Sequence, residues 1–385
     1  MLEILFIPLA IVGASLIPKR KMNDENKIME IFKSKNICVK RGENVIYPKK
    51  IRISEGIGVK TYSYSLPLGI AANQIEPIKE AFENGLNKDI DIKFNGLLHL
   101  VVAQNKLPTK WDYSMGLLNE NTWEVPIGKN HDGVLYHDFE KYPHMLIGGT
   151  TRFGKTVLLK GIFNTLVTNQ FENVNLYILD LKAGLEFYKY SGLEQVKKVA
   201  CDLMEASEVL ESVVTELKKR EVFYRENGIT NVVETSIQKR TFIIVDEGAE
   251  LSPELVSKEA KPYAQYCQNL LGEIARIGGG LGYRLVFCTQ YPVRQAVPAQ
   301  VKMNIVTRIS FLVPEQVGSR VILDEVGAED LPAIAGRCIY KVEKKRILQT
   351  PFIDDGMIKN FIGGAINGEN RRVVNDNRQI ENDNY

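Results

Sequence analysis

The chain has 385 residues, 44% of them apolar and 25% charged, so it can bury a full core and is neither disordered nor fibrous. Its 49 Lys and Arg against 47 Asp and Glu leave a formal charge of +2, so no chain-wide positive field marks a polyanionic partner, although a ring can still concentrate basic residues on its channel wall. The five scattered cysteines lack CxxC spacing, which indicates buried apolar positions in a reducing cytosol and excludes a disulfide framework or a zinc site.

The first segment is an uncharged apolar run over residues 4–18, which ends at Lys19, Arg20 and Lys21. It is short for a membrane-spanning helix, which needs about 17 to 25 residues, and its length also suits a signal peptide. A basic flank on the carboxyl side predicts that the rest of the chain faces the cytoplasm. We therefore expect residues 1–21 to be a membrane anchor with its basic flank, at the cell membrane and with a cytoplasmic motor domain. A buried terminal helix and a cleaved signal are the alternatives.

Residues 22–120 are expected to form a small α+β domain. Three short segments alternate apolar and polar residues, as half-buried strands do, and one segment has a helical pattern. Nothing in this part of the sequence indicates chemistry. The alternating segments are residues 61–68, 89–94 and 97–102, and the helical segment is 75–86.

From residue 121, short apolar runs are separated by long amphipathic helices, a pattern typical of a mostly parallel sheet covered by helices on both faces. The clearest helix covers residues 203–224, where apolar residues recur at three- and four-residue spacing. We expect an α/β domain over residues 121–355 and a disordered polar tail over 356–385. The predicted strands are residues 144–148, 174–180, 241–246, 284–289 and 307–313.

An octet with the pattern GxxxxGK[ST] follows the first of these strands and opens a helix. Its glycines let backbone N–H groups curl around phosphates, Lys155 reaches the β and γ phosphates of ATP, and the Thr156 hydroxyl binds Mg²⁺. The positive end of the helix attracts the same anion. The predicted nucleotide-binding residues are Gly149, Thr150, Thr151, Arg152, Phe153, Gly154, Lys155 and Thr156.

An acidic pair ends the predicted strand 241–246 and fits the second half of such a site. Asp246 is expected in the metal shell, and Glu247 is expected to orient and deprotonate the attacking water. Thr289-Gln290 stands at the end of the strand 284–289, where a polar side chain can sense the γ-phosphate and report hydrolysis, and Gln290 is the residue expected in the site. These three residues are the first candidates for catalysis.

The order and spacing of these motifs resemble the motor domain of the FtsK and SpoIIIE DNA translocases, from about residue 126 to 336. Asp180 and Lys182 in the segment LDLK match the family's Asp-Pro-Lys after the second strand, and Ala275-Arg276 followed by glycines is in the family's place. The resemblance implies a RecA-like P-loop NTPase core, an ATP hydrolase coupled to DNA translocation.

The resemblance further implies a homo-hexameric ring around DNA, with each ATP held between two subunits. Arg276 matches the position of the family's arginine finger, which would neutralise charge on the γ-phosphate of a neighbouring subunit. Arg308 and Arg320 are the other candidates for this role.

Three departures distinguish this sequence from the chromosomal translocases. The interior of the octet carries Thr-Arg-Phe instead of Thr-Gly-Ser, and Tyr291 follows Gln290 where those proteins carry Arg. In the roughly 35 polar residues after the core we expect no winged-helix module of the kind that orients those proteins on DNA. The layout is similar to that of the FtsK-type coupling proteins of conjugative plasmids and integrative elements of Gram-positive bacteria.

The resulting hypothesis is a membrane-tethered, ATP-dependent translocase that moves plasmid or mobile-element DNA in conjugative transfer. It would contact the phosphate backbone with little sequence preference and would dock on transfer-channel or relaxase proteins. A soluble motor for plasmid or phage DNA replication or packaging is one alternative, and a nucleotide-dependent ring scaffold is another.

Overall fold

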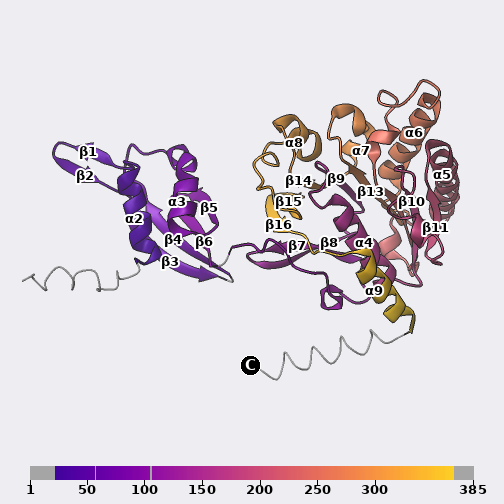
Figure 1. The fold of residues 1–385 in the computed structure, drawn as a ribbon, viewed down its shortest axis with the longest axis horizontal. Helices are drawn as coiled ribbons and strands as arrows, with labels where there is room; N and C mark the ends of the chain where they lie inside the picture. The colour runs from indigo at the N-terminus through magenta and orange to yellow at the C-terminus, as the bar shows by residue number, and fades with distance from the viewer. Residues whose placement is uncertain (1–21, 57, 105, 368–385) are drawn as a thin grey trace, which may run out of the picture. The chain divides into compact units, whose positions relative to one another are not determined.

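The computed structural model describes residues 22–56, 58–104 and 106–367. The chain folds into two compact units, and the division between them falls after Lys106. Figure 1 labels the helices and strands of both units.

The amino-terminal unit is a small α+β fold, as predicted. Its sheet is antiparallel in the order β3-β4-β6-β5, and β1 and β2 form a separate hairpin. The core forms where Phe32 of α2 packs edge-on against Tyr64 of β4 and Phe82 of α3, with ring centroids 5.2 Å and 5.4 Å apart. The elements are α2 (Asp24–Ser34), β1 (Val39–Arg41), β2 (Asn44–Ile46), β3 (Lys49–Gly56), β4 (Val59–Ser65), α3 (Lys79–Leu86), β5 (Ile90–Asn95) and β6 (Leu97–Ala103).

The boundary between the units differs from the predicted one after residue 120. Trp111 Nε1 donates a hydrogen bond to the carbonyl of Gln349 at 2.8 Å, and the Tyr113 hydroxyl shares one with Thr165 Oγ1 at 2.7 Å. Tyr113 is buried in the core of the second unit. Residues 107–120 therefore belong to the large unit, because their aromatic side chains find polar and apolar partners there.

The large unit is built on a ten-stranded sheet in the order β11-β10-β12-β13-β9-β14-β15-β16-β7-β8. The six strands from β11 to β14 are parallel, and the other four extend the sheet by antiparallel pairs. All five predicted strands are present with small shifts at their ends. The strands are β7 (Glu124–Asn130), β8 (Gly133–Asp138), β9 (His144–Gly148), β10 (Val174–Leu179), β11 (Val196–Ala200), β12 (Arg240–Val245), β13 (Tyr283–Thr289), β14 (Thr307–Phe311), β15 (Arg337–Lys341) and β16 (Lys345–Gln349).

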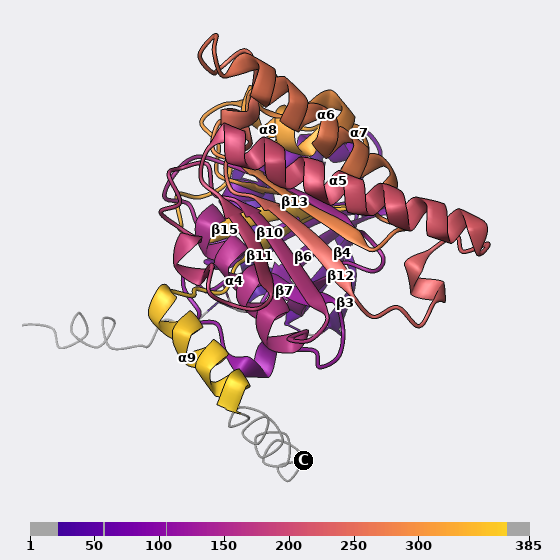
Figure 2. The ribbon, with the colours of Figure 1, turned by 90° about the vertical axis from the view of Figure 1, so that its right-hand side faces the viewer.

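Helices cover both faces of this sheet, as Figure 2 shows. The predicted helix from residue 203 is α5, which begins where the Asp202 side chain accepts a hydrogen bond from Glu205 N. Helices α4 and α9 share one apolar core, and α5 to α8 share the core on the opposite face. The helices are α4 (Lys155–Asn169), α5 (Leu203–Glu226), α6 (Lys261–Ile277), α7 (Ala299–Met303), α8 (Gln316–Leu323) and α9 (Asp355–Asn367).

The two ends of the chain test the sequence predictions only in part. Where a disordered tail is predicted from residue 356, the structure has α9, because Ile358 and Ile362 are buried against the core that includes α4. The rest of the predicted tail lies outside the described residues, as does the apolar run 4–18. Among the residues described, no helix is long and apolar enough to cross a membrane.

Candidate active site

Three neighbouring strands bring the octet, the acidic pair and Gln290 to one edge of the sheet. β13 lies between β9 and β12 and is parallel to both, so the three strands end at the same edge. The octet follows β9, the acidic pair follows β12 and Gln290 follows β13. The carboxyl edge of a parallel sheet is where ligands bind in open α/β folds.

The backbone of the octet curves into a cradle, and the conformations at Gly149 and Gly154 are ones that glycine adopts readily and other residues do not. Gly149 has φ +138° and Gly154 has φ +107°, a region that other residues avoid. A Cβ atom on Gly149 would lie 2.7 Å from Phe311 Cβ, and one on Gly154 would lie 3.0 Å from the backbone nitrogen of Gly336. Thr150 N and Oγ1 both donate to the carbonyl of Leu312 at 3.0 Å, which fixes the loop against the end of β14.

Lys155 begins α4 and is held inside the loop. Its side chain is 4% exposed, and Nζ donates a hydrogen bond to the carbonyl of Thr150 at 2.8 Å. Burial lowers the pKa of Lys155. No side chain caps the amino end of α4, so its first N–H groups are available to an anion. Thr151 and Arg152 are exposed on the loop, and Arg152 has φ +70°.

The acidic pair is buried beside this loop. Asp246 is 1% exposed, and its Oδ2 has no hydrogen-bond partner among the described residues. Burial raises the pKa of Asp246 to about 6, while the ammonium of Lys182 acts in the opposite direction. Glu247 is 0% exposed, and the two carboxylates belong to one continuous polar cluster.

Lys182 joins the cluster although the sequence motifs did not assign it a role beyond the family match. Its Nζ lies 3.3 Å from Glu247 Oε2 and 3.7 Å from Asp246 Oδ2. Asp180 and Lys182 both lie just after β10, and Asp180 Oδ2 accepts hydrogen bonds from the backbone of Glu186 and Phe187 at 2.9 Å and 2.7 Å. The sequence does carry a signal for this cluster, because charged residues directly follow both β10 and its neighbour β12.

Gln290 contacts the acidic pair through its backbone. Its N–H points at both oxygens of Glu247, at 3.0 Å and 3.1 Å. The side-chain contact comes from the preceding residue, because Thr289 Oγ1 donates to Glu247 Oε1 at 2.8 Å. Strand alternation explains this difference, since neighbouring residues on a strand point to opposite faces.

This arrangement agrees with a comparison of the chain with known protein families. The FtsK/SpoIIIE family profile matches residues 115–242, which contain the octet and the beginning of β12. The chain contains a P-loop ATPase domain of the FtsK/SpoIIIE type.

Relatives of this FtsK/SpoIIIE-type domain are found among curated proteins. The chain is 25% identical over 375 residues to the DNA translocase FtsK of Streptococcus pneumoniae, an alignment that covers 89% of this chain and 48% of that protein. It is 30% identical over 213 residues to the DNA translocase FtsK of Caldanaerobacter subterraneus subsp. tengcongensis, covering 54% of this chain and 29% of the relative. The chain thus spans about half the length, or less, of these curated relatives.

Solved structures support the same fold. The pCW3 conjugation coupling protein TcpA, in its monomer form with ATPgS, superposes with a TM-score of 0.64 at 23% identity and covers 88% of this chain and 99% of that one. The cytoplasmic domain of the Thermomonospora curvata type VII secretion ATPase EccC gives a TM-score of 0.54 at 22% identity, over 65% and 32% of the two chains. The large unit therefore has the predicted RecA-like P-loop ATPase fold, and the match to TcpA extends over most of the chain.

The site of the FtsK/SpoIIIE-type domain fits ATP with Mg²⁺. A Cβ atom at Gly149 or Gly154 would collide with its surroundings, so the two glycines keep the cradle open. Asp246 Oδ2, which has no hydrogen-bond partner among the described residues, is a hard oxygen ligand that lies after β12, two strands away from β9. The described residues contain no cluster of three or more acidic, histidine or cysteine ligands that could hold a metal by themselves. Mg²⁺ suits such a site because it commonly binds through one or two protein oxygens, phosphates and waters.

Arg276 lies at the opposite edge of the sheet from the P-loop. It stands in the last turn of α6, whose end at Gly278 is hydrogen-bonded to Tyr283, the first residue of β13. β13 has seven residues, so the two edges are separated by about 20 Å along the strands. Within one chain, Arg276 therefore does not reach Glu247.

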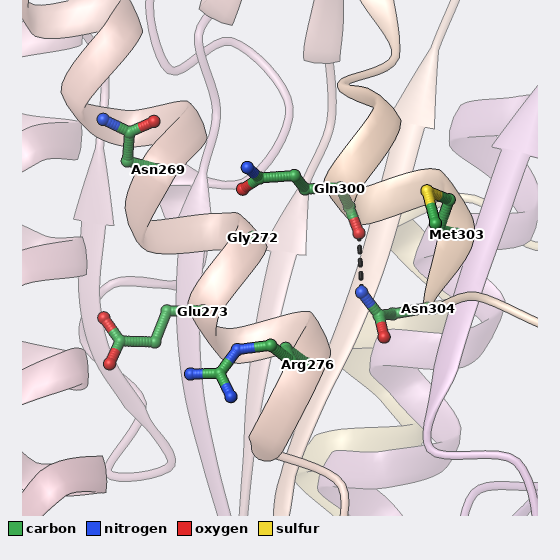
Figure 3. A pocket seen from close by; sticks show the side chains of 7 residues that line it. All are labelled: Asn269, Gly272, Glu273, Arg276, Gln300, Met303 and Asn304. Atoms are coloured by element: carbon green, nitrogen blue, oxygen red, sulfur yellow. Dashed lines mark hydrogen bonds between the residues drawn. The ribbon is translucent and has the colours of Figure 1, made fainter.

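The surroundings of Arg276 form an open hollow of about 530 Å³ between α6 and α7 (Figure 3). Arg276 is exposed there and makes no hydrogen bond or ion pair within the described part of the chain. Polar side chains from both helices line this hollow. Its lining is Asn269, Gly272, Glu273, Arg276, Gln300, Met303 and Asn304.

The two other arginines named from the sequence differ from Arg276. Arg308 is 12% exposed, forms an ion pair with Asp324 and donates to the carbonyl of Ile322 at 3.2 Å. Arg320 is exposed in the last turn of α8. Arg308 is thus committed within its own subunit, while Arg276 and Arg320 are free to meet a ligand.

Proposed function

We propose that the protein is an ATP-driven DNA translocase that works as a hexameric ring and moves plasmid or mobile-element DNA during conjugative transfer. The observation that carries this proposal is a site divided between two edges of the sheet. The P-loop, Asp246 and Glu247 share one edge, while the unpaired guanidinium of Arg276 stands at the other. Head-to-tail contact between subunits would bring the two edges together and would close into a ring.

The residues of the carboxyl edge divide the work of hydrolysis. Lys155 turns from the carbonyl of Thr150 to the phosphates, and the first N–H groups of α4 bind the same charge. Thr156 and Asp246 would hold Mg²⁺, which when bound offsets phosphate charge. Glu247 orients a water and takes its proton, and Arg276 of a neighbour stabilises the charge that develops on the γ-phosphate.

The choice of DNA as the moved polymer rests on the relatives. The two FtsK proteins above are named DNA translocases, and TcpA is named a conjugation coupling protein. We expect contacts to phosphates, so binding should be sensitive to salt and indifferent to sequence. The membrane tether at residues 4–18 and docking on transfer-channel or relaxase proteins complete the proposal.

The first test is ATP hydrolysis by the full chain with no DNA, with duplex DNA and with single-stranded DNA. Stimulation by either form that is lost in Lys155→Ala supports the translocase and identifies the strand form that engages it. Lys155-dependent hydrolysis that DNA does not change, in a protein that forms rings, supports the scaffold alternative instead.

The second test asks whether Arg276 acts in a neighbouring subunit. Arg276→Ala keeps its own P-loop, and Lys155→Ala keeps its own arginine, so each variant is expected to be inactive alone. Mixing them should restore part of the hydrolysis rate, because one class of interface then combines an intact P-loop with an intact Arg276. Full activity of Arg276→Ala by itself would contradict the role, and Arg320→Ala is the matched variant for the other free arginine.

The third test concerns location. The full chain and a variant lacking residues 1–21 are expressed in the same host, and the membrane and soluble fractions are assayed for the protein. We expect only the full chain in the membrane fraction. Equal distribution of both would favour the soluble motor for replication or packaging.

A further inference from the structure

The carboxylate of Glu247 is surrounded by hydrogen-bond donors. Oε1 accepts from Thr289 Oγ1 at 2.8 Å, from Gln290 N at 3.0 Å and from Ala249 N at 3.3 Å. Oε2 lies 3.1 Å from Gln290 N and 3.3 Å from Lys182 Nζ. A carboxylate has about four lone-pair positions, and these four donors occupy them. With its side chain 0% exposed, Glu247 has no position left for the water that a general base must reach.

We propose that Thr289 and Lys182 are positioning residues that hold Glu247 back from its water until nucleotide and DNA are bound. This inference rests on the proposed function, because it concerns the same hydrolytic site. It assigns these two side chains a restraining role, which is the opposite of presenting Glu247 ready for reaction.

The turn after β10 is built to aim Lys182 at the acidic pair. Asp180 Oδ2 closes the turn by accepting the two backbone hydrogen bonds from residues 186 and 187. Ala183, the next residue after Lys182, has φ +58°, and Gly184 has φ +71° with Cys201 Sγ 2.7 Å from the place of a Cβ. A non-glycine residue at positive φ persists only where its surroundings impose it, and such strain is concentrated at functional sites.

Thr289 connects Glu247 to the P-loop strand. Thr289 is paired in register with Gly148, the residue before the octet, and its side chain is 0% exposed. The hydroxyl has one proton, so while it donates to Glu247 it accepts from Tyr291 N at 3.2 Å. A movement of the P-loop can therefore reach the Thr289 hydroxyl, which restrains Glu247, through the pairing of β9 with β13.

Lys182 provides a means of release. Its side chain is 30% exposed, in contrast to those of Thr289 and Glu247, so it is able to move. The phosphates of a bound nucleotide add negative charge beside the P-loop and compete with Glu247 for the ammonium. Loss of that ion pair leaves Oε2 in contact only with Gln290 N, which it shares with Oε1, and so opens a position on the oxygen that Thr289 does not contact.

The test uses the full chain and the nearly isosteric variant Thr289→Val. The rate of ATP hydrolysis is measured without DNA and with saturating DNA, and binding of a fluorescent ATP analogue is measured separately. We expect the DNA-free kcat to rise about tenfold, as one hydrogen bond to a charged group is lost, with the Kd of the analogue unchanged to within about twofold. The ratio of DNA-stimulated to basal rate falls accordingly.

Three further variants make the result specific. Thr289→Ser keeps the hydroxyl and should restore the DNA dependence. Thr241→Val changes a buried threonine at the amino end of β12 and should leave both rates as in the wild type. Lys182→Gln removes the second restraint from a partly exposed position and should also raise the DNA-free rate, which decides the question if Thr289→Val does not fold.

A fall in both rates, or no change in either, in Thr289→Val and in Lys182→Gln would overturn the restraint. These residues would then present Glu247 in its working position or contribute only to packing. Failure of the proposed function has a different signature, which is wild-type protein whose Lys155-dependent hydrolysis is absent or is not stimulated by DNA. The two failures are therefore separable in one set of assays.

Discussion

The two edges of the ten-stranded sheet both bury charge, but they treat it differently. At the amino edge, Glu140 accepts hydrogen bonds from Arg240 Nε and Nη2 at 2.9 Å and 2.8 Å and from Arg284 Nη2 at 2.9 Å. At the carboxyl edge, Asp180 and Asp246 each keep one buried oxygen without a hydrogen-bond partner in the described residues. Buried charge that is paired is structural, whereas buried charge left with spare capacity marks the place for a ligand.

The pKa shifts follow the same division. Burial alone would raise the pKa of Glu140, but the two guanidinium groups hold it below its usual value. Burial raises the pKa of Asp246 to about 6, and the single ammonium of Lys182 at 3.7 Å does not cancel it. Among the described residues, the carboxylate of the amino edge is therefore fully paired, although Arg284 Nε has no hydrogen-bond partner there, whereas the unpartnered atoms of the carboxyl edge are carboxylate oxygens.

The largest expected effect is on catalysis at the carboxyl edge. Glu247→Gln should lower kcat by about 10²- to 10⁴-fold, because an amide cannot take a proton from water. Nucleotide binding should persist, since Lys155 and the loop are intact. The matched change at the other edge, Glu140→Gln, should leave kcat per folded molecule unaltered. An equal loss of kcat in both variants would remove the functional distinction between the edges.

The next effect is on stability at the amino edge. Glu140→Ala leaves two guanidinium groups, 5% and 1% exposed, without their shared carboxylate. We expect the free energy of unfolding to fall by about 3–5 kcal/mol. Urea unfolding measures this, with the exposed Glu172→Ala as the control, for which the change should stay within about 0.5 kcal/mol. A loss no greater than the control's would mean that the paired charges are not structural.

The sequence predicted the parallel half of the sheet well and its antiparallel half poorly. Buried parallel strands are continuous apolar runs, and all five that were predicted are present, while α5 begins at its predicted residue. β15 is buried over four of its five residues, but it begins with Arg337 and ends with Lys341, and β16 is exposed over its first three residues, so neither strand has such a pattern. The placement of residues 107–120 in the large unit depends on contacts such as Trp111 with Gln349, which join distant parts of the chain.

The site was predictable where a local motif exists. The octet and the acidic pair are contiguous in sequence, so their chemistry can be inferred from a few residues. Lys182 was matched to the family without a role, and Thr289 was named only beside Gln290 as part of a γ-phosphate sensor. Their contacts with Glu247 come from strand order, which places β10 and β13 on either side of β12. The position of Arg276 at the far edge was likewise a consequence of the direction of α6. Its role in a neighbouring subunit stays a prediction.

The third effect is a dependence on pH at the carboxyl edge. The folded chain holds a proton on Asp246 up to about pH 6, whereas an unperturbed aspartate loses it near 3.8, so stability falls as pH rises between these values. Asp246→Asn removes the cost of burying an ionised carboxylate. The variant should therefore have a higher free energy of unfolding than the wild type above pH 6, by on the order of 2 kcal/mol, and the difference should shrink toward pH 4. Unfolding curves at several pH values measure it.

We expect the same ionisation to weaken hydrolysis at low pH, since the carboxylate form of Asp246 is the one able to hold a metal and protons compete with Mg²⁺ for it. Metal-dependent hydrolysis should decline below about pH 6 in the wild type. A stability difference between Asp246→Asn and wild type that is independent of pH would contradict the burial of an ionisable Asp246.

The smallest expected effect is that of Ala183→Gly, which tests whether the backbone of the turn after β10 is strained. Ala183 has φ +58°, which costs an alanine about 1–2 kcal/mol relative to glycine in the same conformation. Ala183→Gly removes that cost but adds freedom to the unfolded chain, so we expect a net gain in unfolding free energy of about 0.5 kcal/mol. Gly184→Ala should act in the opposite direction by about 2 kcal/mol, because its φ is +71° and a Cβ would lie 2.7 Å from Cys201 Sγ. Opposite signs at two adjacent residues would show that the backbone of this turn is imposed by its surroundings. Equal signs would mean that the turn relaxes, and that Lys182 is not held in place by strain.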